Sequence, residues 1–360
     1  MAVSPGETRV FSNCWRSLVC AGLLLAALIC GPALAQQTRY FRIGTAATGG
    51  SFFEIGGILA GAISSPADAP PCGHGGSCGV PGLVAVAQAT PGSVENLKLI
   101  NDGQIESGFA QSDLAGWAYK GIGDFAGAGP MPQLRAIASL FPEAAHLVVR
   151  SDSPIHSVAD LAGKRVSLGE AGSGTAADAR VLLAAAGLAE TDLTRKYLRP
   201  GPAADELKAG TIDAFFLVGG TPIPAIRDLA ISMPIRLVSL DGEIVDALKK
   251  DFGFYHRARI PADAYPGVDA DTASFGFYAL WLVNADIDTE LVYAITRSLW
   301  HEATEKLLTA ADPIGQRIRL NQALDGVPVP LHPGAERFYR EAGLPVDTVP
   351  QPEAREVKDK

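Results

Sequence analysis

Two glycine-rich stretches, GTAATGGS at residues 44–51 and GEAGSGT at residues 169–175, decide the fold of this chain. Each follows a short apolar run and precedes an amphipathic segment, so each is typical of a turn from a strand into a helix. At such a turn the first backbone N–H groups of the helix have no partner inside the helix and carry the positive end of its dipole. These groups bind anions. Two such turns predict a cleft that holds an anionic ligand from both sides.

The segments that follow the two stretches have the apolar spacing of helices. After the first stretch, apolar residues recur at Ile55, Ile58, Leu59, Ala62 and Ile63. After the second, the same spacing is found at Ala179, Leu182, Leu183 and Ala186. Gly187 stands where a C-terminal helix cap belongs. We therefore expect two helices whose buried faces fix the position of their N-terminal ends.

A weaker repeat indicates two related halves. The segments GQIESGF at residues 103–109 and GTIDAFF at 210–216 both read as a turn that enters a buried strand. Each strand is followed by a polar loop, at residues 111–113 and 219–222. Chance recurrence of small acidic loops is the alternative. Strands that alternate with helical patterns predict an α/β fold, in which ligands bind at the C-terminal ends of strands.

Two apolar runs predict that the chain crosses between two domains and returns. Residues 145–150 and 275–283 read as strands, and two crossing strands form a hinge. We predict lobe I from residues 36–150 plus 277–350, lobe II from residues 151–276, and a flexible tail over 351–360. The length of 360 residues agrees with two domains. The net charge of −9 argues against a nucleic-acid surface.

The N-terminal segment has the pattern of a cleaved signal peptide. Arg9 and Arg16 precede an apolar stretch over residues 18–29, and Ala33-Leu34-Ala35 forms a small-x-small cleavage site. We predict cleavage after Ala35 and a periplasmic mature protein. A membrane anchor is the alternative, but the apolar stretch is shorter than the ~20 residues that span a bilayer. A lipoprotein at Cys30 is disfavoured because Ile29 precedes it.

Cleavage would remove Cys14, Cys20 and Cys30 and leave Cys72 and Cys78. An even pair in an oxidising compartment predicts a disulfide. The two cysteines lie in a glycine-rich loop, so the bridge would hold a surface loop. A metal site that also uses His74 is the competing hypothesis.

The motifs of common enzymes are incomplete. Both glycine stretches lack the lysine of a nucleotide-binding P-loop, and Gly50 stands where the first would have it. Ser173 lacks the outer glycines of a hydrolase elbow. His301 and Glu302 lack the second histidine of a zinc protease helix. We expect no catalysis, cofactor or metal. The hydroxyls that precede the predicted helices, which either cap them or contact a ligand, are Ser51, Ser112, Ser173 and Thr175.

A set of segments in order along residues 40–344 resembles a known family. They are RIGTAATGG at 42–50, GSVENL at 92–97, QSD at 111–113, KRVSL at 164–168, GSGT at 172–175, IDAFF at 212–216 and PLHPGAERFY at 330–339. Together they resemble the extracytoplasmic solute receptors of the TAXI branch of TRAP transporters. The resemblance implies a two-lobed, type II-like periplasmic binding protein, in which each lobe is a mixed sheet flanked by helices and two strands form the hinge.

The resemblance also implies the partners and the site. The protein would deliver a small anion or amino acid, such as glutamate, glutamine or 2-oxoglutarate, to TRAP membrane permease subunits. We expect a monomer. A sensor kinase or chemoreceptor module is the alternative, and an enzyme using Ser173 or Asp213 is less favoured. Many members of the resembled family have tyrosines at the positions that Phe52 and Phe53 occupy in this chain. Carried over by motif, the ligand-binding residues are Thr48, Gly49, Gly50, Ser51, Phe52, Gln111, Ser112, Gly172, Ser173, Gly174, Thr175 and Gly219.

Overall fold

The computed structural model describes residues 38–240 and 256–350. All of them belong to one compact unit that begins at Thr38. The predicted signal peptide with its cleavage site, and the predicted tail over 351–360, lie outside the described residues. In the part of the chain that is described, no helix is both long and apolar enough to cross a membrane.

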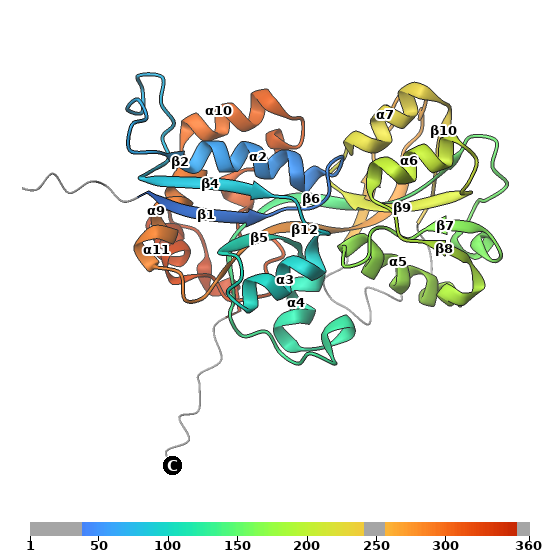
Figure 1. Cartoon of the computed structure of the whole chain (residues 1–360), viewed down its shortest axis with the longest axis horizontal. Helices are drawn as coiled ribbons and strands as arrows, with labels where there is room; N and C mark the ends of the chain where they lie inside the picture. Colours follow the sequence, from blue (N-terminus) through green and yellow to red (C-terminus); the bar gives the residue numbers. More distant parts are fainter. Residues whose placement is uncertain (1–37, 241–255, 351–360) are drawn as a thin grey trace, which may run out of the picture. The chain divides into compact units, whose positions relative to one another are not determined.

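The described strands form a single mixed sheet flanked by helices, which confirms the predicted α/β class (Figure 1). Its order is β3-β2-β4-β1-β5-β12-β6-β9-β7-β8, with β10 on β6 and β11 on β12. The strands are β1 (Arg39–Gly44), β2 (Ser64–Ser65), β3 (Val80–Pro81), β4 (Leu83–Gln88), β5 (Ser107–Gln111), β6 (Leu134–Arg150), β7 (Arg165–Ser167), β8 (Thr194–Lys196), β9 (Ala214–Gly219), β10 (Ile235–Val238), β11 (His256–Ile260) and β12 (Thr272–Asn284).

Two long strands, β6 and β12, lie side by side in the middle of this sheet and connect its two ends. They pair with each other over residues 134–144 and 276–284. β12 then pairs with β5, and the later part of β6 pairs with β9 and β10. The expected crossing strands are therefore present, but β6 begins at Leu134, 11 residues before the strand predicted at residue 145. The lobe boundaries at residues 150 and 276 stay a prediction.

Helices cover both faces of the sheet at each end, as Figure 1 shows. We call β1 to β5 with their helices the large side, and β7 to β10 with theirs the small side. On the large side α2 packs on β4 while α3 packs on β5. On the small side α5 and α6 pack on β9. The helices are α2 (Ser51–Ile63), α3 (Ser93–Asn101), α4 (Ser112–Lys120), α5 (Gly174–Ala185), α6 (Pro200–Lys208), α7 (Pro224–Ser232), α9 (Thr289–Leu299), α10 (Glu302–Ala311) and α11 (Pro333–Glu341).

The two helices predicted from apolar spacing are α2 and α5. In α2 the residues of the predicted face are buried, except that Ile58 is partly buried. In α5 the predicted face is also buried up to Leu183. Gly187 follows the C-cap with a φ of 74°, the left-handed conformation that glycine adopts most readily. Both glycine stretches therefore end at the first turn of a helix with a fixed, buried face.

The sequence repeat corresponds to a repeated arginine–carboxylate contact. Glu106 accepts hydrogen bonds from the backbone N of Arg42 at 2.8 Å and from its guanidinium at 2.7 and 2.9 Å. Asp213 accepts the same set from Arg165, and these bonds hold the pKa of Asp213 below its usual value. Each contact joins two parallel strands, β1 with β5 and β7 with β9. In both halves, the same kind of arginine–carboxylate contact therefore fixes two neighbouring parallel strands relative to each other.

The predicted disulfide is present between Cys72 and Cys78, with Cα atoms 4.7 Å apart. Among the described residues, the Nδ1 or Nε2 atom of His301, rather than of His74, lies within 4.8 Å of both sulfurs. Because both thiols are used by the bridge, the metal alternative is not supported. The loop contacts the remainder of the fold through the carbonyl of Cys78, which accepts a hydrogen bond from Ser298 Oγ at 3.2 Å.

The double variant Cys72→Ser/Cys78→Ser is expected to lose at most about 2 kcal/mol of unfolding free energy, because so short a loop restricts the unfolded chain little. Urea denaturation of the oxidised protein and the double variant measures this loss. No residue of this loop lines the cavity between the two ends of the sheet, so ligand affinity should stay within twofold. A tenfold fall in affinity would show that the loop takes part in binding.

Candidate functional site

A cavity of about 60 Å³ lies where the large side meets the small side. Its wall contains residues 46–47, 50–52 and 91–93 of the large side and residues 169–170 and 173–175 of the small side. Direct hydrogen bonds cross between the sides around it. The backbone N of Gly220 donates to Ser51 Oγ at 3.1 Å, and Gln111 Nε2 donates to Asp178 Oδ2 at 2.8 Å. The two sides therefore enclose the cavity.

Five of the helices in the described residues begin at this cavity. Residues of the first turn or N-cap of α2, α3, α4, α5 and α6 all line it: Gly50, Ser51, Phe52, Gly92, Ser93, Gln111, Ser173, Gly174, Thr175 and Pro200. Each helix has at least nine residues. The positive ends of their dipoles converge on one small volume, which favours a negatively charged group there. The sequence patterns predicted an anion site at the starts of α2 and α5; they did not predict that α3 and α6 also begin at the cavity.

Seven of the twelve predicted ligand residues line the cavity. They are Gly50, Ser51, Phe52, Gln111, Ser173, Gly174 and Thr175. Five lie beside it instead. Thr48 and Gly49 line a groove on the outer surface, next to α6 and α7. Ser112 is turned toward β12, where its Oγ accepts a hydrogen bond from the backbone N of Tyr278 at 3.1 Å.

The other two glycines lie at contacts between the sides. The carbonyl of Gly172 accepts a hydrogen bond from the backbone N of Glu95 at 3.2 Å. Gly219 packs against Ser51, and an added Cβ there would lie 2.9 Å from Ser51 Oγ. Their neighbours Gly174 and Val218 reach the cavity in their place.

The hydroxyl groups do more than cap helices. Ser173 is the N-cap of α5, and its Oγ accepts a hydrogen bond from the backbone N of Ala176 at 3.0 Å. In contrast, Thr175 Oγ1 accepts from the backbone N of Val218 at 3.1 Å, and Ser51 Oγ accepts from Gly220. These two hydroxyls bind α5 and α2 to the loop region around the end of β9. They hold the wall of the cavity together.

Close packing explains the glycine at position 174. A Cβ added there would lie 1.6 Å from Gln111 Oε1 and 2.8 Å from Ser93 Oγ. The same two side chains are fixed by each other, since Ser93 Oγ donates to Gln111 Oε1 and accepts from the backbone N of Gln111, both at 3.2 Å. The start of α5 therefore contacts the start of α4 with no room for a side chain.

One wall of the cavity is apolar. Phe52 is 6% exposed and packs edge-to-face on Phe109 and Phe141, with ring centroids 5.7 and 6.3 Å away. Leu198 and Leu217 line the cavity from the small side. The wall offers no hydroxyl at Phe52, where the resembled family often has tyrosine. The polar contacts of a ligand would therefore come from the helix starts and from the acids described next.

Three buried carboxylic acids lie in and behind the cavity wall. Glu143 of β6 is 3% exposed and lines the cavity. Asp113 of α4 and Asp178 of α5 are also fully buried. Burial raises the pKa of Glu143 well above its usual value, and the negative charge of Asp113 raises it further. Burial also raises the pKa of Asp178, with a further contribution from Asp113.

The sequence patterns missed Glu143, although a signal for it exists. The segment LRAIASLFPEAAHLVVR is one 17-residue strand in which Glu143 is a charged residue among buried neighbours. An acid inside a buried strand indicates a functional or paired group. The strand predicted to start at residue 145 leaves Glu143 outside, whereas β6 contains it.

Asn96, which the sequence patterns also did not identify, fixes the beginning of the first glycine stretch through hydrogen bonds to its backbone. Its Nδ2 donates to the carbonyl oxygens of Gly44, Thr45 and Phe109 at 3.1, 2.7 and 2.8 Å. Its Oδ1 accepts from Thr90 Oγ1 at 2.8 Å. One fully buried amide thus joins the ends of β1 and β5 to α3. Asn96 belongs to GSVENL, one of the segments that carry the family resemblance.

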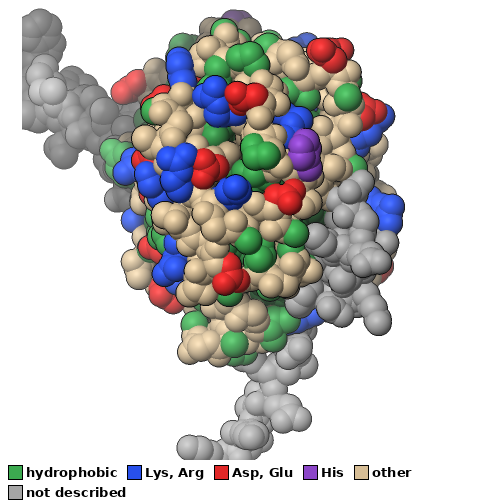
Figure 2. All heavy atoms as spheres, turned by 90° about the vertical axis from the view of Figure 1, so that its right-hand side faces the viewer, with side chains coloured by type: hydrophobic (Ala, Val, Ile, Leu, Met, Phe, Trp, Pro, Cys, Tyr) green, Lys and Arg blue, Asp and Glu red, His purple; other side chains and the backbone are tan. Residues whose placement is uncertain are grey.

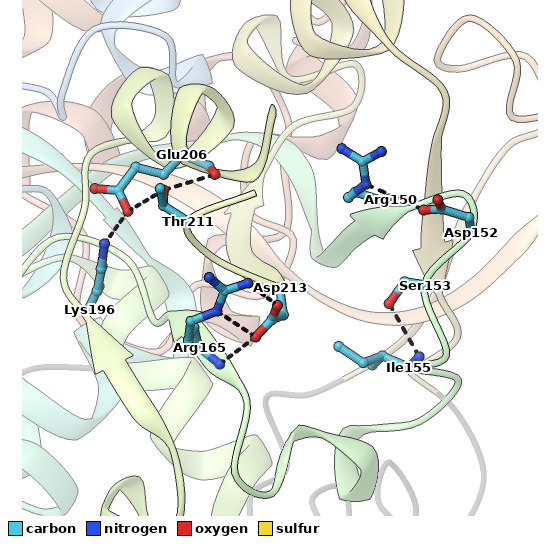
Figure 3. Close-up of polar contacts among 9 residues, drawn as sticks. All are labelled: Arg150, Asp152, Ser153, Ile155, Arg165, Lys196, Glu206, Thr211 and Asp213. Atoms are coloured by element: carbon cyan, nitrogen blue, oxygen red, sulfur yellow. Dashed lines mark hydrogen bonds and ion pairs between the residues drawn. The ribbon is translucent and has the colours of Figure 1, made fainter. Parts of the chain in front are cut away.

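A second groove, on the surface of the small side, is a weaker candidate. It is lined by Arg150, Lys164 and Arg165, whose charges would suit an anion. Figure 3 shows that Arg165 faces Asp213 and that Arg150 lies beside Asp152, 3.3 Å away. Two of its three cations are thus neutralised. In Figure 2, the face at the right-hand end of Figure 1 likewise mixes positive and negative side chains.

The chemistry of the cavity wall is suited to the binding of a small molecule. No histidine, lysine or arginine is among the described residues that line the cavity. Ser173 is occupied as a helix cap, and Asp213 lies outside the cavity in its contact with Arg165. The enzyme alternative relied on these two residues, and the structure does not bring them together at the cavity.

Several solved structures are similar to this chain at low identity. The alkanesulfonate-binding protein SsuA from Xanthomonas axonopodis pv. citri, bound to MOPS, is 18% identical with a TM-score of 0.45, over 86% of this chain and 82% of that chain. The periplasmic aliphatic sulphonate binding protein SsuA from Escherichia coli is 18% identical with a TM-score of 0.39, over 84% and 83%. An ancestral arginine-binding protein bound to arginine is 15% identical with a TM-score of 0.41, over 85% and 99%.

A protein-family model gives the firmer assignment. The model described as the NMT1-like family matches residues 43–343. This range contains both glycine stretches, both shared strands and all of the cavity wall. The chain belongs to the NMT1-like family.

Proposed function

We propose that this chain is a periplasmic solute receptor without catalytic activity. The observation that carries the proposal is the enclosed cavity between the two sides, with five helix starts directed at it. Such a site suits a small solute with a carboxylate, of the glutamate, glutamine or 2-oxoglutarate kind. The sides would separate to admit the solute and close over it, and the shared strands β6 and β12 would form the hinge.

The partner in this proposal is a TRAP membrane permease of the TAXI type, as the sequence resemblance suggests. The signal peptide would be cleaved after Ala35, and the mature receptor would act as a monomer. The closed form would bind the permease better than the open form, so solute would shift the population toward delivery. A module that passes the closed form to a sensor kinase or chemoreceptor would use the same cavity.

The full chain, expressed with its own N-terminal segment and recovered from the periplasm, tests the proposal. N-terminal sequencing should begin at Gln36. After removal of bound small molecules, thermal unfolding is measured with amino acids, keto acids and dicarboxylates. A true ligand at 100 times its Kd adds about 2.7 kcal/mol of stability. If no compound raises the Tm and no small molecule co-purifies, the receptor proposal is wrong.

Loss of uptake separates the two possible partners. Deletion of the gene should abolish uptake of the identified solute into cells if the receptor supplies a permease. Unchanged uptake together with a lost transcriptional or swimming response to the solute would assign the receptor to a sensor.

A further inference from the structure

We propose that the solute is a zwitterion, a small α-amino acid, whose carboxylate lies at the helix starts and whose ammonium group binds Glu143. This inference rests on the proposed receptor function and narrows its ligand. It separates amino acids from the keto acids and dicarboxylates that the helix starts alone would also accept.

The first argument is an unsatisfied buried oxygen. Glu143 is 3% exposed, yet its Oε2 atom has no hydrogen-bond partner among the described residues. Buried polar atoms in native proteins nearly always have partners, and an exception points to a group that is bound in function. Because Glu143 lines the cavity, a donor on the solute can supply the missing hydrogen bond.

The second argument is the balance of charge. Among the described residues, the groups that act on Glu143 or share the cavity wall with it are acids: Asp113 from α4, Asp178 from α5 and Glu170 from the loop before α5. His256 of β11 lies beyond Gly276, near the backbone carbonyl of Glu143, and does not line the cavity. Glu170 also lines the cavity, and its Oε1 lies 3.4 Å from Nε of Arg199, which is not part of the described cavity wall. A dicarboxylate without an amino group would add a second negative charge beside these acids and meet no cationic side chain in that wall. An ammonium group would instead neutralise the acid that it contacts.

The third argument is geometry. The helix starts reach the cavity from both the large and the small side, whereas Glu143 stands on β6, a strand that both sides share. A solute that carries a negative and a positive group close together can contact both the helix starts and Glu143 within one small volume. An α-amino acid has this arrangement, since its carboxylate and ammonium groups are attached to the same carbon.

Proton release accompanies this mode of binding. In the empty cavity, burial and the neighbouring acids favour the protonated form of Glu143. A bound ammonium group favours the carboxylate form, so binding expels a proton. A protonated Glu143 that donated to a solute carboxylate would have the opposite sign, because binding would then raise its pKa further and take up protons at neutral pH.

The variant Glu143→Gln tests the inference, with Glu54→Gln, at an exposed acid of α2, as the matched control. Isothermal titration uses the twenty common amino acids and the 2-oxo and 2-hydroxy acids of the same side chains. The wild type should bind its preferred amino acid at least 100-fold more tightly than the 2-hydroxy counterpart. Glu143→Gln should lose at least 50-fold for the amino acid and less than fivefold for the 2-hydroxy acid. Glu54→Gln should change neither.

Titration in two buffers of different ionisation heat adds an independent measurement. The wild type should release protons on binding the amino acid at pH 7, and Glu143→Gln should not. Equal affinity for the oxo or hydroxy acid, proton uptake, or an unaffected Glu143→Gln would overturn the zwitterion assignment while leaving the receptor function in place. Failure of the wild type to bind any small carboxylate would overturn both.

Thermal unfolding of Glu143→Gln tests whether the variant is folded. The raised pKa of Glu143 also predicts how the Tm difference from the wild type changes with pH. A carboxyl with a raised folded-state pKa contributes stability that is complete below the unfolded value of about 4.5 and is lost as the pH rises through the folded pKa. Glu143→Gln should therefore match the ligand-free wild type in Tm near pH 4 and exceed it at pH 7. A lower Tm at pH 7 would show that the carboxylate has a structural partner.

Discussion

Replacement of Asn96 by aspartate is expected to lower the free energy of unfolding by about 3–5 kcal/mol at neutral pH, the largest stability effect that we predict for a near-isosteric change. The variant Asn96→Asp keeps the shape of the side chain but removes its two N–H donors. Three carbonyl oxygens, those of Gly44, Thr45 and Phe109, would then face a carboxylate instead of an amide. A buried, unpaired charge against three acceptors is strongly unfavourable.

Urea unfolding followed by tryptophan fluorescence measures this effect. The midpoint should fall while the m-value stays unchanged. The loss should shrink as the pH is lowered toward 4, because the introduced acid then takes up a proton. Asn321→Asp, the same change at an exposed position, is the control and should shift stability by less than about 0.5 kcal/mol. A loss below 1 kcal/mol for Asn96→Asp would mean that the amide does not hold β1, β5 and α3 together.

Replacement of Gly174 by alanine is expected to abolish solute binding, with at least a 100-fold loss of affinity. The new Cβ would lie 1.6 Å from Gln111 Oε1, so the Gln111 side chain must move. Its hydrogen bonds to Ser93 and Asp178 would then break, and the displaced atoms would occupy a cavity of only about 60 Å³. The helix start itself tolerates alanine, because Gly174 is the first residue of α5 and its φ is not positive.

Gly57→Ala is the matched control for Gly174→Ala. Gly57 lies inside α2, and an added Cβ there meets no atom within 4 Å. This control should raise stability by up to about 1 kcal/mol and leave affinity unchanged. Titration calorimetry with the solute identified in the screen, and thermal unfolding without it, separate binding from folding. Undiminished binding by Gly174→Ala would place the solute outside this cavity.

The fold class and part of the cavity wall could be predicted because local patterns determine them. Apolar spacing in α2 and α5, and the glycine stretches before them, depend on neighbours within a few residues. The repeated acids Glu106 and Asp213 could also be recognised, because each stands at the same place before a buried strand. Their partners, Arg42 and Arg165, could not, since each pair spans at least 48 residues of sequence.

The remaining features depend on contacts that no local pattern contains. Glu143 and Asn96 are single polar residues, and their roles depend on residues that are far away in the sequence but close in space. Thr48 and Gly49 belong to the first glycine stretch, yet the stretch turns so that they face outward toward α6 and α7. The convergence of five helix starts follows from the order of strands in the sheet, which the alternation of strands and helices leaves open.

The place of β12 in the sheet has a consequence for the order in which the chain can fold during biosynthesis. β12 lies between β5 and β6, in the middle of the sheet, but it is the last strand to be synthesised among the described residues. Until residue 284 has left the ribosome, β5 and β6 lack the strand that joins them, and the core around Trp281 is incomplete. A nascent chain of this topology therefore cannot complete the middle of its sheet before β12 is made.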